Sequence, residues 1–169
     1  MNTGMKRYNV LFLCTGNSAR SVLAEALLNK WGGGVFRAYS AGSRPVGKVN
    51  PLAIELLRSR GHPVEGLRSK SWDEFAKPGA PEMDIVVTVC DNAAGETCPV
   101  WTGNPVRAHW GMEDPAAVEG SPDERMKAFQ RVYDELERRI KRLAAIPAGP
   151  LGPAEIKKRL DEIGRAGKP

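Results

Sequence analysis

The sequence has few cysteines and few histidines. It holds 3 Cys and 2 His among 169 residues. Cys14, Cys90 and Cys98 are an odd number, and no two of them have the short spacing of a zinc knuckle or a C-x-x-C redox motif. This scarcity argues against a disulfide framework and against a structural zinc site. We interpret the cysteines as reactive thiols, and we expect neither a metal nor a cofactor.

Long hydrophobic runs are also missing. No apolar run approaches the roughly 18 residues that span a membrane. The first residues lack the long apolar region of a secretory signal. We therefore expect a cytoplasmic protein that does not bind a membrane.

A basic stripe with interleaved aromatic residues is absent too, although the net charge is +5 at pH 7. The lysines and arginines gather instead in the last predicted helices. The positive charge favours anionic ligands in general. Nucleic-acid binding is the weaker alternative, and we expect no nucleic-acid partner.

The apolar pattern predicts a single domain of the α/β class. Short apolar runs that suit β-structure predict strands at residues 8–13, 35–40, 83–90 and 105–110. Helical spacing, caps and breakers predict helices at residues 19–30, 50–61 and 121–143, and a short helix that is capped by Ser69 or Ser71 and extends to Ala76. The run at 83–90 is nearly continuously apolar, which is typical of a central strand in a parallel sheet.

Residues 1–146 are expected to form the domain, and residues 147–169 to follow as a Pro/Gly-rich linker and a short basic helix. The apolar residues Ile156, Leu160 and Ile163 mark that helix. We interpret it as an appendage whose charges are solvated. His62, beside Gly61 and a proline, is interpreted as a surface residue without chemistry.

One loop joins the first predicted strand to the first predicted helix. In such a turn the backbone N–H groups point into one concavity above the positive end of the helix, and they can hold a tetrahedral oxyanion without a metal. We call this segment the anion loop; its residues are Cys14, Thr15, Gly16, Asn17, Ser18, Ala19, Arg20 and Ser21.

The residue types in the anion loop suit a nucleophile that attacks an oxyanion. Loop N–H groups and a helix dipole can lower a cysteine pKa from ~8.5 to roughly 3.5–7.5, so we expect a lowered pKa for Cys14. The planar fork of Arg20 matches two oxygens of a phosphate-like ligand. Gly16 permits a tight turn, Asn17 can brace the loop, and Ser21 can donate its hydroxyl to the sulfur. The alternative is an inert buried cysteine beside a surface arginine.

Two more residues are predicted to lie near the anion loop. Cys90 ends the central strand as Cys14 ends the first one, and the active crevice of an open α/β sheet forms beyond the carboxyl ends of its strands. The two cysteines can therefore meet across the crevice. Asp114 follows the last predicted strand and is expected to overhang the crevice; the alternative is a turn residue before Pro115.

The anion loop resembles that of the low-molecular-weight tyrosine phosphatase fold, as used by thioredoxin-coupled arsenate reductases. The similarity extends from about Tyr8 to Leu143. It implies a three-layer fold with a central four-stranded parallel sheet flanked by helices. Two further features resemble the arsenate reductase branch: the pair Cys90 and Cys98, and the H-W-G-M-E-D-P run at 109–115.

This resemblance implies the reduction of arsenate to arsenite without a cofactor. Cys14 is then the nucleophile, Arg20 and the loop amides hold the oxygens, and Asp114 is the acid. Phosphate and sulfate are the competing oxyanions. Cys90 and Cys98 carry a disulfide relay, and thioredoxin or glutaredoxin is the reductant.

Two alternatives remain open. A phosphatase for phosphotyrosine or small phosphate esters would share Cys14, Arg20 and Asp114, although alanines rather than a tyrosine follow Asp114 and Pro115. A thiol-based sensor of arsenite or of redox state would have no enzymatic activity.

Some of these reductases bind a potassium ion near the anion loop. Asn17, Glu25 and Ser40 could supply oxygens for it here. Lys70, however, stands near the place of an acidic ligand in those enzymes, so we expect its ammonium group to replace the cation.

Overall fold

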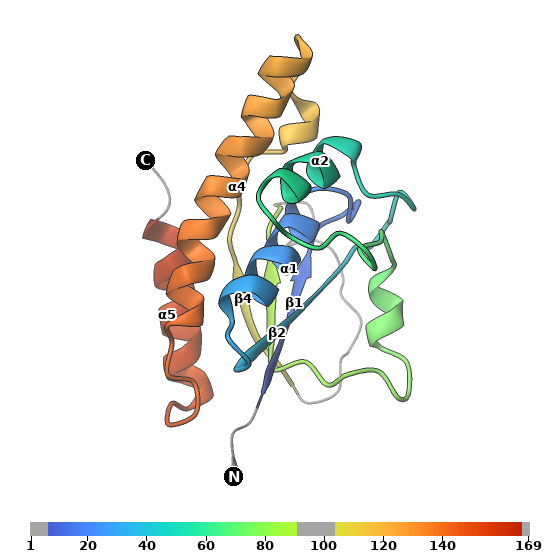
Figure 1. The fold of residues 1–169 in the computed structure, drawn as a ribbon. Coiled ribbons are helices and arrows are strands. Elements are labelled where there is room, and N and C mark those ends of the chain that lie inside the picture. The colour runs from blue at the N-terminus through green and yellow to red at the C-terminus, as the bar shows by residue number, and fades with distance from the viewer. Residues whose placement is uncertain (1–6, 91–103, 167–169) are drawn as a thin grey trace.

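A computed structural model describes residues 7–90 and 104–166 of the chain (Figure 1). The strands are β1 (Tyr8–Leu13), β2 (Phe36–Ala41), β3 (Ile85–Thr88) and β4 (Val106–His109). The helices are α1 (Arg20–Trp31), α2 (Pro51–Ser59), α4 (Pro122–Ala144) and α5 (Pro153–Ala166), with the short 3-10 helices η1 (Trp72–Phe75) and η2 (Pro115–Ala117). None of the helices in these two ranges has the length and apolar character that a membrane span requires.

All four strands run parallel in one sheet, in the order β2-β1-β3-β4. The register aligns their carboxyl ends, because Leu13 pairs with both Ala41 and Thr88, and Thr88 pairs with His109. The residues that follow each strand therefore lie along one edge of the sheet. The predicted α/β fold with a four-stranded parallel sheet is confirmed.

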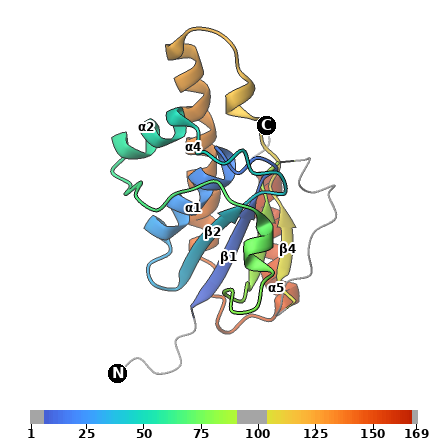
Figure 2. The same ribbon diagram turned by 90° about the vertical axis from the view of Figure 1, so that its right-hand side faces the viewer.

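Helices cover the two faces of the sheet unequally (Figure 2). On one face, α1 packs against β2 and α4, and α5 packs against β4. The opposite face buries a smaller apolar cluster, in which Phe75 of η1 packs with Leu11, Leu13 and Val86 of the sheet. Strand β1 is buried on both faces, which explains its continuous apolar sequence.

Local capping residues begin α2 and α4 where the sequence predicts. The Asn50 side chain accepts the N–H of Leu52 at 2.9 Å, with Pro51 in the first turn of α2. Ser121 forms a capping box with Glu124 at the start of α4. The buried stripe of α4 includes Phe129, Val132, Tyr133, Leu136, Ile140 and Leu143.

Side chains of two helices form hydrogen bonds with backbone groups on both edge strands of the sheet, β2 and β4. On β2, the Asn29 amide accepts the N–H of Ala38 at 2.8 Å and donates to its carbonyl at 3.2 Å. On β4, the Lys157 ammonium donates to the Arg107 carbonyl at 2.9 Å. The first side chain comes from α1 and the second from α5.

Helix α5 is not the appendage that the sequence analysis expects. Its residues Ile156, Leu160 and Ile163 are buried in the same core as β1 and α4. Trp110, which is fully buried, donates its indole N–H to the Leu160 carbonyl at 2.9 Å. A Cβ atom at Gly164 would lie 2.8 Å from the Trp110 ring, so only glycine permits this contact. The helix therefore closes the β4 side of the core.

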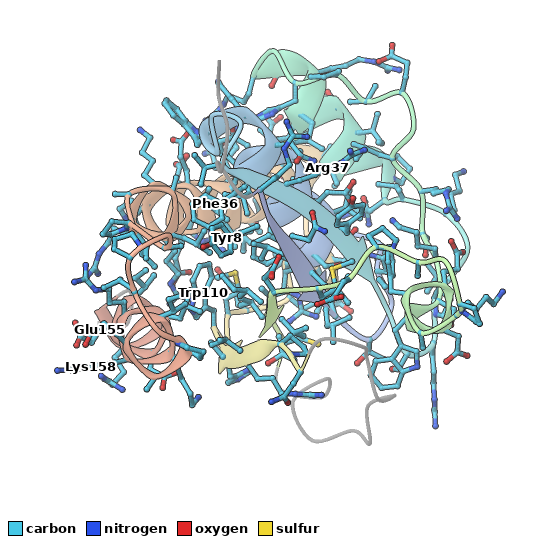
Figure 3. The ribbon with its side chains drawn as sticks, turned by 90° about the horizontal axis from the view of Figure 1, so that it is seen from below. Tyr8, Phe36, Arg37, Trp110, Glu155 and Lys158 are labelled. Atoms are coloured by element: carbon cyan, nitrogen blue, oxygen red, sulfur yellow. The ribbon has the colours of Figure 1, made fainter. Side chains whose placement is uncertain are left out.

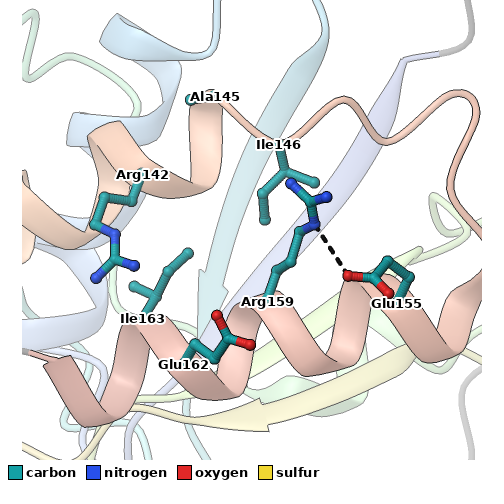
Figure 4. Close-up of a pocket in the computed structure, with 7 residues that line it drawn as sticks. All are labelled: Arg142, Ala145, Ile146, Glu155, Arg159, Glu162 and Ile163. Atoms are coloured by element: carbon teal, nitrogen blue, oxygen red, sulfur yellow. Dashed lines mark hydrogen bonds and ion pairs between the residues drawn. The ribbon is translucent and has the colours of Figure 1, made fainter.

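The charged side chains of α5 lie away from this contact. Figure 3 shows Trp110 inside the molecule, with Glu155 and Lys158 on the outer side of α5. Between the end of α4 and α5 lies a pocket of about 370 Å³, beside which Arg159 and Glu155 form an ion pair at 3.3 Å (Figure 4). An exposed pair of this kind contributes little to stability. The expected solvated character of these charges agrees with the structure.

The buried face of α5 predicts a large effect of truncating Leu160. We expect Leu160→Ala to lower the free energy of unfolding by about 2–5 kcal/mol, because it leaves a cavity against Trp110. The exposed Lys158→Ala on the same helix is the control, with a change within about 0.5 kcal/mol. Urea unfolding measures both; equal effects of the two substitutions would mean that α5 is not part of the core.

Candidate active site

The anion loop lies at the switch point of the sheet. Strand β1 is followed in sequence by β2 on one side, while β3 lies on its other side. A crevice forms at the carboxyl ends of strands where the chain changes direction in this way. Cys14 directly follows β1, and Arg20 begins α1, so the loop spans the predicted strand-to-helix turn.

The carbonyl groups of the anion loop are held by the segment that follows β2. Arg44, Val46 and Asn50 donate their backbone N–H groups to the carbonyls of loop residues at 2.9–3.1 Å; these acceptors are Thr15, Gly16 and Ser18. Because its carbonyls are engaged on that side, the N–H groups of the loop face the opposite side, where the two cysteine sulfurs lie. This is the arrangement that the sequence predicts for an oxyanion site.

Asn17 braces the loop from within. It is fully buried and has a positive φ of 46°, which asparagine tolerates better than most residues. Its side chain donates to the Ser21 hydroxyl at 2.7 Å and accepts the backbone N–H of Lys70 at 2.9 Å. The predicted brace is confirmed. The proposed hydrogen bond from Ser21 to the sulfur stays a prediction.

Gly42 supports the loop from below, and the sequence analysis assigns it no role. A Cβ atom at Gly42 would lie 2.4 Å from the Thr15 carbonyl oxygen and 2.6 Å from that of Cys14. Any other residue would push the loop away from β2. The only sequence signal was a small residue at the end of a strand, and it becomes specific only once the strand register is known.

The start of α1 provides uncapped backbone donors. Ala19 occupies the cap position, offers no side-chain hydrogen bond, and is followed by a first turn without an acidic residue. The first N–H groups of a helix need partners from outside it. A bound oxyanion satisfies them and also interacts with the positive end of the helix dipole.

Arg20 extends from α1 toward the loop that follows β4. Its Nη1 donates to the Met112 carbonyl at 3.1 Å, and its Nη2 lies 3.7 Å from Asp114 Oδ2. Its buried Nε has no hydrogen-bond partner among the described residues. A buried guanidinium donor without a partner is unfavourable, so this atom suits an anionic ligand.

Asp114 performs the turn role that the sequence analysis offers as its alternative. Its side chain accepts the Ala116 N–H at 3.0 Å and so caps η2 ahead of Pro115. The same carboxylate, with 44% of its side chain exposed, lies beside Arg20. The cap uses Oδ1 of Asp114, whereas Oδ2 faces Arg20.

Cys90 contacts the anion loop, as the strand ends predict. Its Sγ accepts the backbone N–H of Thr15 at 3.3 Å, and its side chain forms a hydrogen bond with that of Cys14. Both cysteines are buried, and neither forms a disulfide bond with another described residue. Cys98 lies outside the described residues.

The expected lowering of the Cys14 pKa is wrong for this structure. The hydrogen bond with Cys90 and the burial of the thiol raise the pKa of Cys14 above its ordinary value, while Arg20 and the Gly16 N–H act in the opposite direction. The loop and the helix dipole alone favour the thiolate. The interaction with the second thiol and the burial of Cys14 outweigh these effects, so the pKa of Cys14 is raised.

His62 also differs from its prediction, because it is buried rather than on the surface. Only 5% of it is exposed, and a ring nitrogen lies 2.7 Å from the Tyr133 hydroxyl. Burial lowers the pKa of His62. The contact joins the end of α2 to α4, so His62 has a structural role.

The contact between the two thiols predicts a change in the reactivity of Cys14. In Cys90→Ala the main cause of the raised pKa is absent, so the pKa of Cys14 falls and its thiolate forms at lower pH. We expect the pH of half-maximal alkylation of Cys14 by iodoacetamide to fall by at least about 1 unit. Peptide mapping across a pH series measures this; a curve that coincides with that of the parent would contradict the interaction between the two thiols.

Comparison with known proteins agrees with this geometry. The model of the family described as low molecular weight phosphotyrosine protein phosphatase matches residues 9–161. An arsenate reductase of Halalkalibacterium halodurans is 40% identical over 140 residues, which cover 83% of this chain and 97% of the relative.

Two solved structures extend the comparison. Arsenate reductase from Archaeoglobus fulgidus superposes with a TM-score of 0.64 at 31% identity, over 81% of this chain and 99% of that one. A thioredoxin-dependent arsenate reductase of Corynebacterium glutamicum gives a TM-score of 0.59 at 26% identity, over 83% of this chain and 62% of that one. Fold, anion loop and sequence together show that the chain belongs to the low molecular weight phosphotyrosine protein phosphatase family.

Proposed function

We propose that this protein is an arsenate reductase that uses thiol electrons to convert arsenate to arsenite. The observation that carries the proposal is the contact of Cys90 with Cys14 and with the Thr15 N–H of the anion loop. A phosphatase needs one nucleophilic thiol, whereas a reductase needs a second thiol within reach of the first. The 40% identical relative named arsenate reductase supports the same activity.

The first step is the attack of Cys14 on arsenic. The loop N–H groups, the start of α1 and the guanidinium of Arg20 hold the arsenate oxygens. The Cys14 thiol gives its proton to an oxygen of the bound arsenate, a sulfur–arsenic bond forms, and one arsenic–oxygen bond breaks as that oxygen leaves as water. Asp114, which lies beside Arg20, is the proposed acid that protonates the leaving oxygen. Phosphate and sulfate have the same tetrahedral shape and compete for the site.

The second step transfers two electrons to arsenic. The Cys90 thiolate attacks the Cys14 sulfur and forms a disulfide bond. The sulfur–arsenic bond breaks with its electron pair remaining on arsenic, which leaves as arsenite. Cys90 lies against the anion loop, where its Sγ accepts the Thr15 N–H and interacts with Cys14, so the attacking sulfur starts beside its target.

The last step restores the Cys14 thiol. Cys98 attacks Cys90, releases Cys14 and leaves a Cys90–Cys98 disulfide for an external dithiol such as thioredoxin. The C. glutamicum relative named as thioredoxin-dependent supports this reductant. Glutaredoxin with glutathione delivers the same two electrons and is the alternative.

Phosphate-ester hydrolysis is the second candidate, and the Arg20–Asp114 pair favours it as a side activity. The pair has the chemistry that protonates a leaving oxygen while the arginine holds the others. The segment after Asp114 provides no aromatic wall for a phenyl ring, since η2 is Pro115–Ala117. We therefore expect slow hydrolysis of aryl phosphates.

The proposed nucleophile is tested by Cys14→Ser. We expect arsenate turnover with thioredoxin and its reductase to fall by at least about 1000-fold, because a serine alkoxide forms far less readily than a thiolate. NADPH oxidation coupled to the thioredoxin system measures the rate. A parent protein that hydrolyses aryl phosphate rapidly but does not reduce arsenate would contradict the proposed function.

The proposed relay is tested by Cys98→Ser. This variant is expected to complete about one turnover and then to accumulate a Cys14–Cys90 disulfide, because that disulfide is buried from a protein reductant. Peptide mapping after one addition of arsenate identifies the disulfide, and the parent is the control. Normal cycling of the variant with thioredoxin would remove Cys98 from the relay, whereas cycling only with glutaredoxin would change the reductant.

A further inference from the structure

A buried ion pair lies beside the anion loop. The Lys70 ammonium is 3.7 Å from Glu25 Oε1, with 7% and 15% of the two side chains exposed. The same ammonium donates to the Arg68 carbonyl at 3.1 Å. Ser40 donates its hydroxyl to Glu25 Oε1 at 2.5 Å. The ammonium thus contacts oxygens of α1 and of the segment before η1, while Ser40 of β2 holds the carboxylate.

This cluster is joined directly to the anion loop. The Lys70 backbone N–H donates to Asn17 Oδ1 at 2.9 Å, and the Ser69 hydroxyl donates to the Gly16 carbonyl at 3.1 Å. The Lys70 carbonyl accepts the N–H of Gly42, the residue on which the loop rests, at 2.9 Å. A shift of Lys70 therefore moves both the brace and the base of the loop.

Each member of the ion pair depends on the other. Burial raises the pKa of Glu25 and lowers that of Lys70, while the attraction between them opposes both shifts. Removal of the ammonium leaves a buried carboxylate without its counter-charge, which is strongly unfavourable. The Glu25 carboxylate therefore needs one neighbouring cation to remain charged in this position.

The residues present do not fit the potassium ion that the resemblance implies near Asn17. The backbone N–H of Lys70 already donates to Asn17 Oδ1, and its ammonium lies beside the Glu25 carboxylate. A potassium ion at this position would be repelled by the positive charge of that ammonium. Among the described residues, no group of three or more His, Cys, Asp and Glu side chains is placed to hold a metal ion.

We propose that the Lys70 ammonium is a built-in cation that positions the anion loop, so that oxyanion binding in this chain is independent of potassium. Lys70 is a positioning residue: it acts on the oxyanion through Asn17 and Gly42 and does not touch it. The inference rests on the anion loop of the proposed function but not on the reduction of arsenate.

Removing the ammonium opens the position to an ion from solvent. Glu25 lines a pocket of about 370 Å³ together with Ala26, Gly61 and Leu67. Through this pocket a potassium ion can reach the carboxylate in Lys70→Ala. The substituted protein should therefore acquire the dependence on potassium that the parent lacks.

The experiment compares phosphate binding in equal concentrations of potassium chloride and choline chloride, by calorimetry. We expect the parent to give the same Kd in both salts. Lys70→Ala should weaken phosphate binding by roughly 10-fold in choline, and potassium should recover most of that loss. Lys127→Ala, which removes an exposed lysine of α4, is the matched control and should behave as the parent.

Three results would overturn the proposal. The first is tighter phosphate binding by the parent in potassium than in choline. The second is unchanged phosphate binding by Lys70→Ala in choline. The third is an equal loss of phosphate binding by Lys70→Ala in both salts, which would mean that potassium cannot replace the ammonium. If Lys70→Ala does not fold, thermal unfolding of the parent in the two salts decides: equal midpoints support the proposal, and a higher midpoint in potassium overturns it. A parent that binds no phosphate contradicts the anion loop itself, while the unfolding comparison still tests Lys70.

Discussion

The active site depends on a backbone loop whose carbonyl groups are held on its outer side, so that its N–H groups face the inner side, toward Cys14 and Cys90. Gly42 lets the strand next to β1 approach the carbonyl oxygens of Cys14 and Thr15 without a side chain between them. Asn17 then ties the loop to Ser21 and to the backbone of Lys70. With these contacts in place, the start of α1, which has no side-chain cap, and the Nε of Arg20, which has no partner in the described part of the chain, are preorganised for an oxyanion.

A second constraint is the interaction between the two buried thiols. The anion loop favours a thiolate at Cys14, but Cys90 and burial favour the thiol. A bound oxyanion adds further negative charge, so one proton between the two sulfurs avoids two adjacent thiolates. The same contact that raises the pKa of Cys14 also prepares the disulfide, because the attacking sulfur is already a neighbour of its target.

The sequence predicts the features that depend on local pattern. Strand β1, the loop from Cys14 to Arg20, and the caps at Asn50 and Ser121 could be found because each signal lies within a few residues. The buried position of His62, the close approach of Gly42 and the packing of α5 on Trp110 could not, because each depends on residues far away in sequence. The prediction of a lowered pKa for Cys14 is wrong for the same reason. The main determinant of that pKa is Cys90, which lies 76 positions further along the chain.

The side chains that occupy the outer strands limit how this protein can associate. Asn29 takes both hydrogen-bonding groups of Ala38 on β2, and Lys157 takes the carbonyl of Arg107 on β4. An exposed strand edge otherwise offers these groups to a strand of another molecule, which is a common route to aggregation. At these positions an incoming strand would have to displace an amide or an ammonium first. Asn29 of α1 and Lys157 of α5 therefore hinder the pairing of a further strand with the β2 edge and the β4 edge of the sheet.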